Sequence, residues 1–301
     1  MAEIQPTDVI DHTDGESKDE HDSKQDLLPR LIAHSILTIA SIIALFPFAF
    51  AIVTSSKRPG NVFTVVSSFA DLFPKAPTIL NYYMVWMQQP LDRWFFNTLI
   101  VAVGVVGLTL LLDSLIGFAL AKGEFVGKRV LYLSVIGLLI IPFQVTMVPL
   151  YVQMSAIGWV NTYWGIIVPF LASPFGAFYM RQYFLTIPDS LLESARMDGC
   201  SNLQIFTRIM LPMSKPALSS LAVFQFIFSW GAFLWPLVIT GKDSMFVLQV
   251  GLAFLTGRYS QNAYGQVLAA TILAALPVIV AYLLAQRTFI EGIALTGAKG
   301  T

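Results

Sequence analysis

Six apolar stretches alternate with polar segments along the chain. They cover roughly residues 31–53, 97–121, 130–155, 163–180, 217–240 and 265–286. Each is close to the length of about 20 apolar residues that a helix needs to cross a bilayer core. Pro169 and Pro174 interrupt the fourth stretch, and such prolines are tolerated where neighbouring helices satisfy the freed carbonyls. The pattern predicts an all-α polytopic membrane protein with six transmembrane helices.

The basic residues between the apolar stretches predict the orientation. The short segment 122–129 contains Lys122, Lys128 and Arg129, whereas the short segment 156–162 contains no basic residue. Because short basic loops stay in the cytoplasm, both termini are predicted to be cytoplasmic. The long segments at 54–96 and 241–264, which are then outside, contain several aromatic residues. Two interpretations stay open for these aromatics: anchors at the membrane surface, or a docking surface for an external partner.

Composition excludes several classes of function. Hydrophobic residues make up 56% of the chain and charged residues 12%, and 18 basic residues balance 18 acidic ones. A net charge of zero leaves no basic footprint for nucleic acid. Because Cys200 is the single cysteine, an intramolecular disulfide and a cysteine-based zinc cluster are excluded.

The first 30 residues differ from the rest of the chain. Half of all acidic residues lie in segment 1–30, which has few large apolar side chains. Such a segment cannot offset its ordering entropy, so we expect a disordered, acidic cytoplasmic tail. It lacks the basic start of a signal peptide. His12 and His21 are interpreted either as metal ligands or, as we favour, as part of a solvated tail.

Segment 181–216, between the fourth and fifth apolar stretches, carries helix signals of its own. It is long for a connection between helices. Gly199 lies where a helix commonly ends in a left-handed residue. Two residue pairs have the spacing of capping boxes: Ser190 with Glu193, and Ser201 with Gln204. The segment predicts a cytoplasmic helix–turn–helix, either packed against its own bundle or inserted as a rigid lever into a partner's groove.

This segment contains the motif Glu193-Ser194-Ala195, three residues, Gly199, nine residues, then Ile209-Met210-Leu211-Pro212. The motif resembles the E-A-A-x3-G-x9-I-x-L-P loop of ABC importer permeases, with Ser194 as the one departure. Further stretches similar to carbohydrate permeases of the maltose-importer (MalG) type follow in order along the chain: 141–151, 161–165, 172–178, 228–237 and 286–300. The resemblance implies the smaller, six-span permease, with 181–216 as its coupling (EAA) loop.

The resemblance also implies the partners. The chain would form half of a sugar pathway and work by alternating access. It has no G-x-x-x-x-G-K-[ST] sequence, the phosphate-binding loop of many ATPases, so we expect neither an enzyme nor a bound cofactor. ATP and Mg²⁺ would belong to a separate dimeric ATPase. The other implied partners are a second permease subunit in a heterodimer, an extracytoplasmic sugar-binding protein and the lipid of the bacterial cytoplasmic (inner) membrane.

Three parts of the chain are expected: tail 1–30, a permease domain at 31–290, and a cytoplasmic C-terminal tail at 291–301. The resemblance assigns contact with the ATPase to a set of coupling-loop residues. Five fill its groove: Leu191, Leu192, Ala195, Met197 and Leu203. Glu193 and Asp198 face basic groups, and Gly199 makes the turn. Three more close the motif: Ile209, Leu211 and Pro212.

Polar and aromatic residues within the apolar stretches are candidates for the substrate pathway, because polar groups are costly inside a membrane. They are Asp113, Gln144, Gln225, Ser229, Trp230 and Phe233. Asp113 is either a paired structural carboxylate at a subunit interface or an acceptor for sugar hydroxyls. Gln225 and Ser229 are four residues apart and share a helix face. For the aromatic residues, core packing and stacking on sugar rings both stay open.

Other functions are weighed beside the sugar permease. The same type of permease carrying glycerol-3-phosphate or another polyol stays open. A self-contained secondary transporter usually shows inverted internal repeats, and none is visible between the halves of this chain. A membrane enzyme is disfavoured, because His-Glu-x-x-His is absent and His34 is isolated in sequence.

Overall fold

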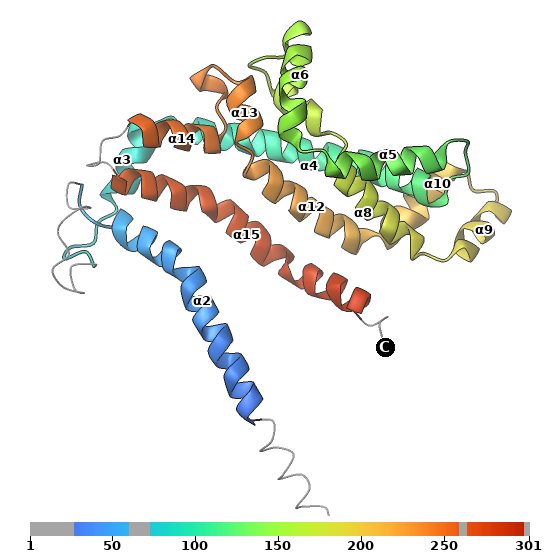
Figure 1. Cartoon of the computed structure of the whole chain (residues 1–301), viewed down its shortest axis with the longest axis horizontal. Coiled ribbons are helices and arrows are strands. Elements are labelled where there is room, and N and C mark those ends of the chain that lie inside the picture. The colour runs from blue at the N-terminus through green and yellow to red at the C-terminus, as the bar shows by residue number, and fades with distance from the viewer. Residues whose placement is uncertain (1–26, 60–72, 259–263, 298–301) are drawn as a thin grey trace, which may run out of the picture. The chain divides into compact units, whose positions relative to one another are not determined.

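The computed structural model describes residues 27–59, 73–258 and 264–297 (Figure 1). These residues form helices and no strand, so the all-α prediction is confirmed for them. The chain divides into two units, residues 1–53 and 54–301, and each is described by itself. Most of the predicted tail 1–30, including His12 and His21, lies outside the described residues, whereas residues 27–30 already belong to the first helix.

The first unit contains helix α2, Leu27–Ser55, whose last two residues belong to the second unit. Large apolar side chains lie along its whole length, and Pro47 stays within the helix. A helix that is apolar on all sides is typical of a membrane span.

The second unit contains the remaining helices. In chain order they are α3 (Leu80–Gln88), α4 (Leu91–Lys122), α5 (Lys128–Ile140), α6 (Phe143–Ala156), α7 (Tyr163–Ile167), η2 (Val168–Phe170), α8 (Pro174–Leu185), α9 (Asp189–Met197), α10 (Asn202–Ile205), η3 (Phe206–Met210), α11 (Leu211–Met213), α12 (Lys215–Trp230), α13 (Leu234–Ile239), η4 (Asp243–Met245), α14 (Leu248–Arg258) and α15 (Tyr264–Gly297). The η2 and η4 turns are 3₁₀-helical, and η3 is π-helical.

The long helix α4 packs most extensively against α8, which lies along it, and α12, which lies beside it (Figure 1). Glycines permit the close approach of α4 and α8. A Cβ atom added at Gly117 would lie 2.7 Å from the Cβ of Met180, and one added at Gly176 would collide with the carboxylate of Asp113. Small residues at helix contacts allow such close packing in membrane proteins.

In the part of the chain that the structure describes, three apolar clusters hold these helices together, and two of them are large. The larger one includes Trp94 on α4, Trp230 on α12 and Trp235 on α13. The second lies where α4 ends and joins Ala121 of α4 to Phe184 of α8 and to residues of α9, α10 and α12. Residues of segment 181–216 therefore belong to the same apolar core as α4, α8 and α12, so the segment is packed against these helices.

The number of spans is lower than predicted when only continuous helices are counted. Among the described residues, α2, α4 and α15 are each long and apolar enough to cross a membrane. Two bent pairs raise the number to five: α5 with α6, bent by 103°, and α7–η2 with α8, bent by 40°. The predicted fifth span, 217–240, is the 16-residue α12 followed, after a break, by the six-residue α13.

The predicted span over 130–155 consists of two helices. Helix α5 ends at Ile140 and α6 begins at Phe143, with extended backbone at Ile141 and Pro142 between them. A proline disfavours the helical conformation of the residue before it and has no N–H to continue the hydrogen-bond ladder. The helix therefore stops before Pro142, and the chain turns by 103°.

Candidate functional site

Segment 181–216, the predicted coupling loop, contains two short helices, α9 and α10, joined by a tight turn. Gly199 adopts a φ of +81°. Its N–H donates to the carbonyl oxygen of Arg196 (3.0 Å), and the N–H of Cys200 donates to that of Ala195 (2.9 Å). These two bonds form the Schellman motif, which ends a helix at a left-handed residue. A Cβ atom at position 199 would meet nothing within 4 Å, so the backbone angle, and not crowding, favours glycine.

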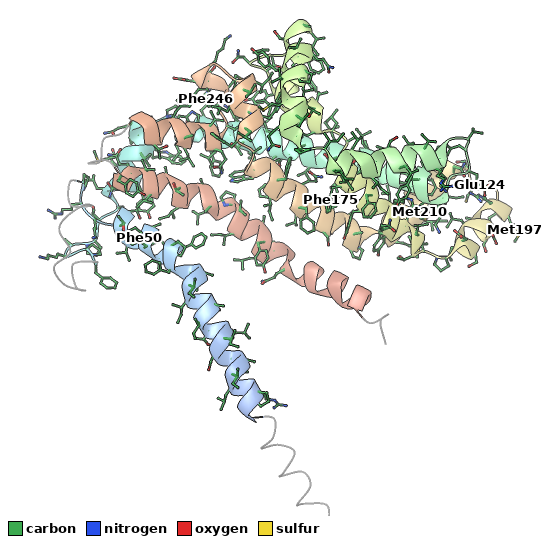
Figure 2. All side chains as sticks on the ribbon, in the orientation of Figure 1. Phe50, Glu124, Phe175, Met197, Met210 and Phe246 are labelled. Atoms are coloured by element: carbon green, nitrogen blue, oxygen red, sulfur yellow. The ribbon has the colours of Figure 1, made fainter. Side chains whose placement is uncertain are left out.

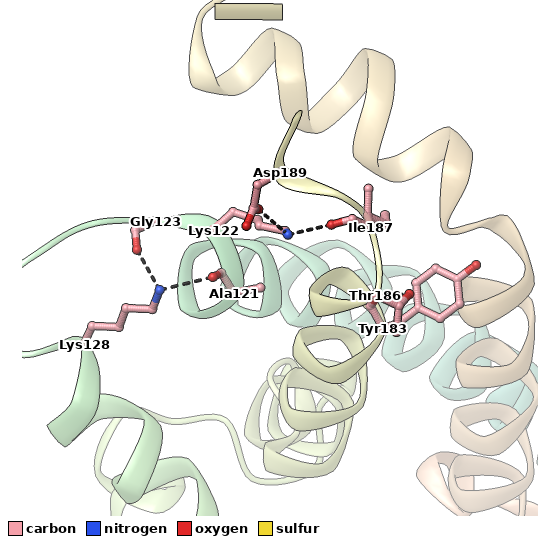
Figure 3. Close-up of polar contacts among 8 residues, drawn as sticks. All are labelled: Ala121, Lys122, Gly123, Lys128, Tyr183, Thr186, Ile187 and Asp189. Atoms are coloured by element: carbon pink, nitrogen blue, oxygen red, sulfur yellow. Dashed lines mark hydrogen bonds and ion pairs between the residues drawn. The ribbon is translucent and has the colours of Figure 1, made fainter. Parts of the chain in front are cut away.

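Helix α9 begins in a different way from the predicted one. Pro188 is its N-cap and no side chain caps the helix, so the predicted capping box at Ser190 is wrong. Instead, Nζ of Lys122, the last residue of α4, donates to Asp189 (2.6 Å) and to the carbonyl oxygen of Ile187 (2.7 Å; Figure 3). The hydrogen bond and charge of this ammonium group lower the pKa of Asp189.

The end of α4 is also fixed to α5. Nζ of Lys128 donates to the carbonyl oxygens of Ala121 (3.1 Å) and Gly123 (2.8 Å; Figure 3). Carbonyls at a helix C-terminus have no partner within the helix, so a lysine there both satisfies them and favours the helix dipole. Two lysines therefore hold the end of α4, one toward α9 and one toward α5.

Helix α10 begins with the second predicted capping box, which is confirmed. Oγ of Ser201 accepts the N–H of Gln204 (3.3 Å), and Oε1 of Gln204 accepts the N–H of Ser201 (2.8 Å). The chain continues through the π-helical η3 into α11, where Pro212 lies in the first turn. A proline is tolerated at the start of a helix, and short π-helical segments occur often at functional sites.

One face of the α9–α10 unit is buried within this chain. Leu192 and Ala195 belong to the same apolar cluster as Phe184 of α8. Ile209 and Leu211 pack against that cluster and are partly buried. Leu192 and Ala195 were predicted to fill a partner's groove, but the structure places them in the chain's own core.

The other three predicted groove residues are exposed. Leu191 is 42% exposed, Met197 86% and Leu203 66%, and Figure 2 shows Met197 projecting from α9. Glu193 and Asp198 are exposed around them. We call the surface of Leu191, Met197 and Leu203 the exposed apolar face. Exposed large apolar side chains with charged neighbours are candidates for a protein interaction site.

A cavity of about 480 Å³ lies among α4, α6, α7, η2, α12 and α13. Three of the six predicted pathway residues line it: Gln144, Ser229 and Phe233. Gln144 is exposed, and Ser229 is buried with its hydroxyl donating to the carbonyl oxygen of Gln225 (2.7 Å). The cavity therefore offers a full amide at Gln144 and the hydroxyl oxygen of Ser229 as an acceptor.

Aromatic side chains that the sequence reasoning did not single out form much of the cavity wall. They are Phe143, Phe170, Phe228 and Trp235. The ring centroid of Phe143 lies 5.3 Å from that of Phe170 and 5.9 Å from that of Trp235. All lining residues are uncharged. The signal that could have found them is the interruption of apolar helices, because each lies in or beside a helix end.

The other three predicted pathway residues do not line this cavity. Trp230 is 1% exposed, and its Nε1–H donates to the carbonyl oxygen of Ala274 on α15 (3.0 Å). Gln225 is buried on α12. The carboxylate of Asp113 accepts the N–H of Ser173, just before α8 (2.8 Å). Asp113 thus has a structural contact, made with a backbone group of the same chain.

A family model described as "Binding-protein-dependent transport system inner membrane component" matches residues 113–288, more than half of the chain. The chain belongs to this family. The matched residues include the whole of segment 181–216 and most of the cavity wall. The resemblance found in the sequence is confirmed.

Individual relatives agree with the family. The "Arabinooligosaccharides transport system permease protein AraQ" of Bacillus subtilis is 36% identical over 261 residues, covering 86% of this chain and 92% of AraQ. The "sn-glycerol-3-phosphate transport system permease protein UgpE" of Yersinia enterocolitica is 29% identical, covering 87% and 95%. A solved bacterial ABC transporter "involved in the import of the acidic polysaccharide alginate" has a chain that is 26% identical, with a TM-score of 0.76 and coverage of 87% and 97%.

Family membership defines the general role of the protein. The chain is an inner-membrane component of a binding-protein-dependent transport system. Its several apolar helices support a multi-pass location in the membrane. Its relatives are transport permeases and not enzymes.

Proposed function

We propose that this permease forms half of the pathway of an ATP-driven sugar importer and is moved by a separate ATPase through the coupling loop. One observation carries the proposal. The α9–α10 unit exposes Leu191, Met197 and Leu203, while Leu192 and Ala195 on its other face share a core with α4, α8 and α12. A partner that binds the exposed apolar face displaces these helices with it, because closely packed elements move as rigid bodies.

The proposed partner at this face is a dimeric cytoplasmic ATPase that binds ATP and Mg²⁺, whereas this chain binds neither. Short amphipathic helices commonly dock into apolar grooves. A second permease subunit supplies the other half of the pathway, and an external sugar-binding protein delivers the substrate. The basic residues of the short loops support an orientation with the coupling loop and both termini in the cytoplasm.

Six spans follow if each interrupted pair crosses the membrane once. They are α2, α4, α5 with α6, α7 with α8, α12 with α13, and α15. Interrupted helices are tolerated at membrane depth where they line a cavity or are buried in protein. The cavity of about 480 Å³ lies at three of these interruptions, which supports its assignment to the pathway.

The cavity supports a neutral sugar as the substrate. Its aromatic rings, including Phe143, Phe228 and Phe233, suit the apolar faces of sugar rings. Gln144 and Ser229 offer hydrogen bonds to hydroxyl groups. An anion such as glycerol-3-phosphate needs cationic partners when it leaves water, and the lining of this half of the pathway carries no charge. The polyol phosphate is therefore the less favoured alternative.

Replacing Gln144 by alanine is expected to raise the KM of uptake about two- to thirteenfold with the maximal rate retained. This range follows from the loss of a hydrogen bond between neutral groups, about 0.5–1.5 kcal/mol. Gln153 is exposed on the same helix and does not line the cavity, so Gln153→Ala is the matched control. Equal KM values for the two variants would contradict the assignment.

Uptake in cells that express the complete transporter tests the function itself. A panel of labelled neutral oligosaccharides, including arabinotriose, cellotriose and maltotriose, is compared with labelled glycerol-3-phosphate. We expect uptake of a neutral oligosaccharide that stops when ATP is depleted. Uptake of glycerol-3-phosphate alone, or uptake driven by an ion gradient without nucleotide, would refute the proposal.

A further inference from the structure

Helix α4 carries a row of buried polar side chains in an otherwise apolar sequence. They are Asn97, Thr98, Thr109, Asp113 and Ser114. A buried polar group is costly unless it is hydrogen-bonded, above all in a membrane protein. The hydrogen-bond partners of this row therefore indicate what it does.

In its second half, side chains of α4 form hydrogen bonds with backbone groups at the ends of other helices. The Thr109 hydroxyl donates to the carbonyl oxygen of the last residue of η2 (3.0 Å). The carboxylate of Asp113 accepts the N–H of Ser173, before α8 (2.8 Å). At the last residue, Nζ of Lys122 donates to the carbonyl oxygen of Ile187, before α9 (2.7 Å).

The first turns of α4 hold segment 244–248, which contains the end of η4 and the start of α14. Nδ2 of Asn97 donates to the carbonyl oxygens of Ser244 (3.1 Å) and Phe246 (2.8 Å). Oδ1 of Asn97 accepts the hydroxyl of Tyr163 on α7 (2.7 Å). With its side chain 2% exposed, Asn97 joins three segments of the chain that are far apart in sequence.

Two neighbouring side chains on α4 hold the same segment. The hydroxyl oxygen of Thr98 accepts the N–H of Leu248 (2.7 Å), the first residue of α14. Nε of Arg93 donates to the carbonyl oxygen of Ser244 (2.9 Å). Segment 244–248 is thus bound to α4 by its own backbone groups.

The chain around this segment has an exposed tip and a buried base. Gly241, Lys242 and Asp243 are exposed, whereas Phe246 and Leu248 are buried. Figure 2 shows Phe246 beside α14. A ligand that contacts the tip therefore acts on a segment whose base is attached to α4.

Helix α4 is continuous between its two ends. It has 32 residues and contains no proline, and at 1.5 Å per residue it is about 48 Å long. That length exceeds the bilayer core of about 30 Å. Figure 1 shows α14 near one end of α4 and α10 near the other. One continuous helix therefore joins the residues that hold segment 244–248 to Lys122, which holds the start of α9.

We propose that Asn97 is the positioning residue that attaches segment 244–248, the base of the exposed tip 241–243, to α4. This attachment couples the outer surface of the permease to nucleotide binding on the ATPase that contacts the coupling loop. The proposal rests on the function proposed above. Coupling between two sites is reciprocal, so ATP on the partner ATPase must change the environment of the tip, just as docking at the tip must favour ATP closure.

The test uses the complete transporter in lipid nanodiscs, with Cys200→Ser to remove the native thiol and Lys242→Cys as a reporter at the tip. The rate at which a membrane-impermeant maleimide labels this chain is measured without nucleotide and with Mg-ATP plus vanadate. With Asn97 intact, we expect nucleotide to change the labelling rate at least about fivefold, the lower range of allosteric coupling.

Two further variants separate attachment from general packing. Asn97→Asp keeps the size of the side chain but cannot donate to Ser244 and Phe246, so the nucleotide effect is expected to fall below about twofold. Tyr163→Phe removes only the bond to Oδ1 of Asn97 and is expected to retain the full effect. If Asn97→Asp does not assemble, Thr98→Val, which removes the acceptor for Leu248, replaces it and is expected to weaken the effect. Assembly and basal ATP hydrolysis are measured for each variant.

The outcomes are distinct. The proposal would be overturned if nucleotide changed the labelling rate of Asn97→Asp as much as it changes that of the chain with Asn97 intact. Where Thr98→Val replaces Asn97→Asp, the same comparison applies to it. The proposal would also be overturned if the transporter with Asn97 intact hydrolysed ATP but nucleotide did not change the labelling rate at position 242. A chain that does not assemble with an ATPase at all would refute the proposed function, and the coupling through Asn97 with it.

Discussion

Replacing Gly199 by leucine is expected to leave the protein in the membrane and to reduce ATP-dependent uptake by at least about tenfold. A branched residue at a φ of +81° is strained by about 1–2 kcal/mol. The strain is relieved by reorienting α9 relative to α10, which moves Leu191 and Met197 away from Leu203. Membrane content is measured by immunoblot and uptake with the labelled sugar that the transporter carries.

The control for this prediction is Gly199→Asn. Asparagine adopts left-handed backbone angles far more readily than leucine, and a Cβ atom at this position meets no neighbour within 4 Å. The asparagine variant is therefore expected to keep most of the uptake. Equal uptake by the leucine and asparagine variants would show that the geometry of the turn does not matter for coupling.

Introducing glutamate at both Met197 and Leu203 is expected to lower the affinity of the permease for its ATPase more than about 100-fold. Both side chains are mainly exposed, so the change leaves the core of this chain intact. Placing two carboxylates in an apolar groove costs several kcal/mol, and about 2.7 kcal/mol already corresponds to 100-fold. Co-purification of the ATPase from detergent-solubilised membranes measures the effect.

A matched control adds the same charge at polar positions. Thr186 and Thr207 are both exposed near the α9–α10 unit, so Thr186→Glu with Thr207→Glu changes the net charge equally without altering the exposed apolar face. The control is expected to retain the ATPase. Loss of the ATPase in both double variants would attribute the effect to charge, and retention in both would exclude the exposed apolar face as the docking site.

The turn of the coupling loop could be predicted from sequence because its determinants are local. Gly199 and the pair Ser201 and Gln204 act on backbone groups within three residues of themselves. The start of α9 could not be predicted in this way. There, no side chain caps the helix, and Lys122, which is 67 residues away from Asp189 in sequence, fixes the helix start by donating to Asp189.

The apolar stretches were likewise easier to predict than their interruptions. Hydropathy indicates where apolar helices lie, but it does not distinguish Pro142, where the chain turns by 103°, from Pro149, which remains inside α6. Both prolines remove a hydrogen-bond donor. Whether the chain bends depends on the neighbouring helices that surround the freed groups, and these are set by tertiary packing.

The candidate pathway shows the same limit. Gln144, Ser229 and Phe233 lie at helix interruptions and line the cavity. Asp113 and Trp230 satisfied the same sequence criterion, yet Oδ1 of Asp113 and Nε1 of Trp230 bind backbone groups of this chain. A buried polar side chain in an apolar helix therefore indicates a contact, and only the structure shows whether the partner is a broken helix or an open cavity.

Photo-crosslinking from position 203 tests the central claim most directly. A benzophenone amino acid replaces Leu203 in the complete transporter, and inner-membrane vesicles are irradiated with and without Mg-ATP. We predict a crosslink to a separate ATP-hydrolysing subunit, with a yield that changes when nucleotide is added. Crosslinks confined to this chain or to the external binding protein would contradict the account.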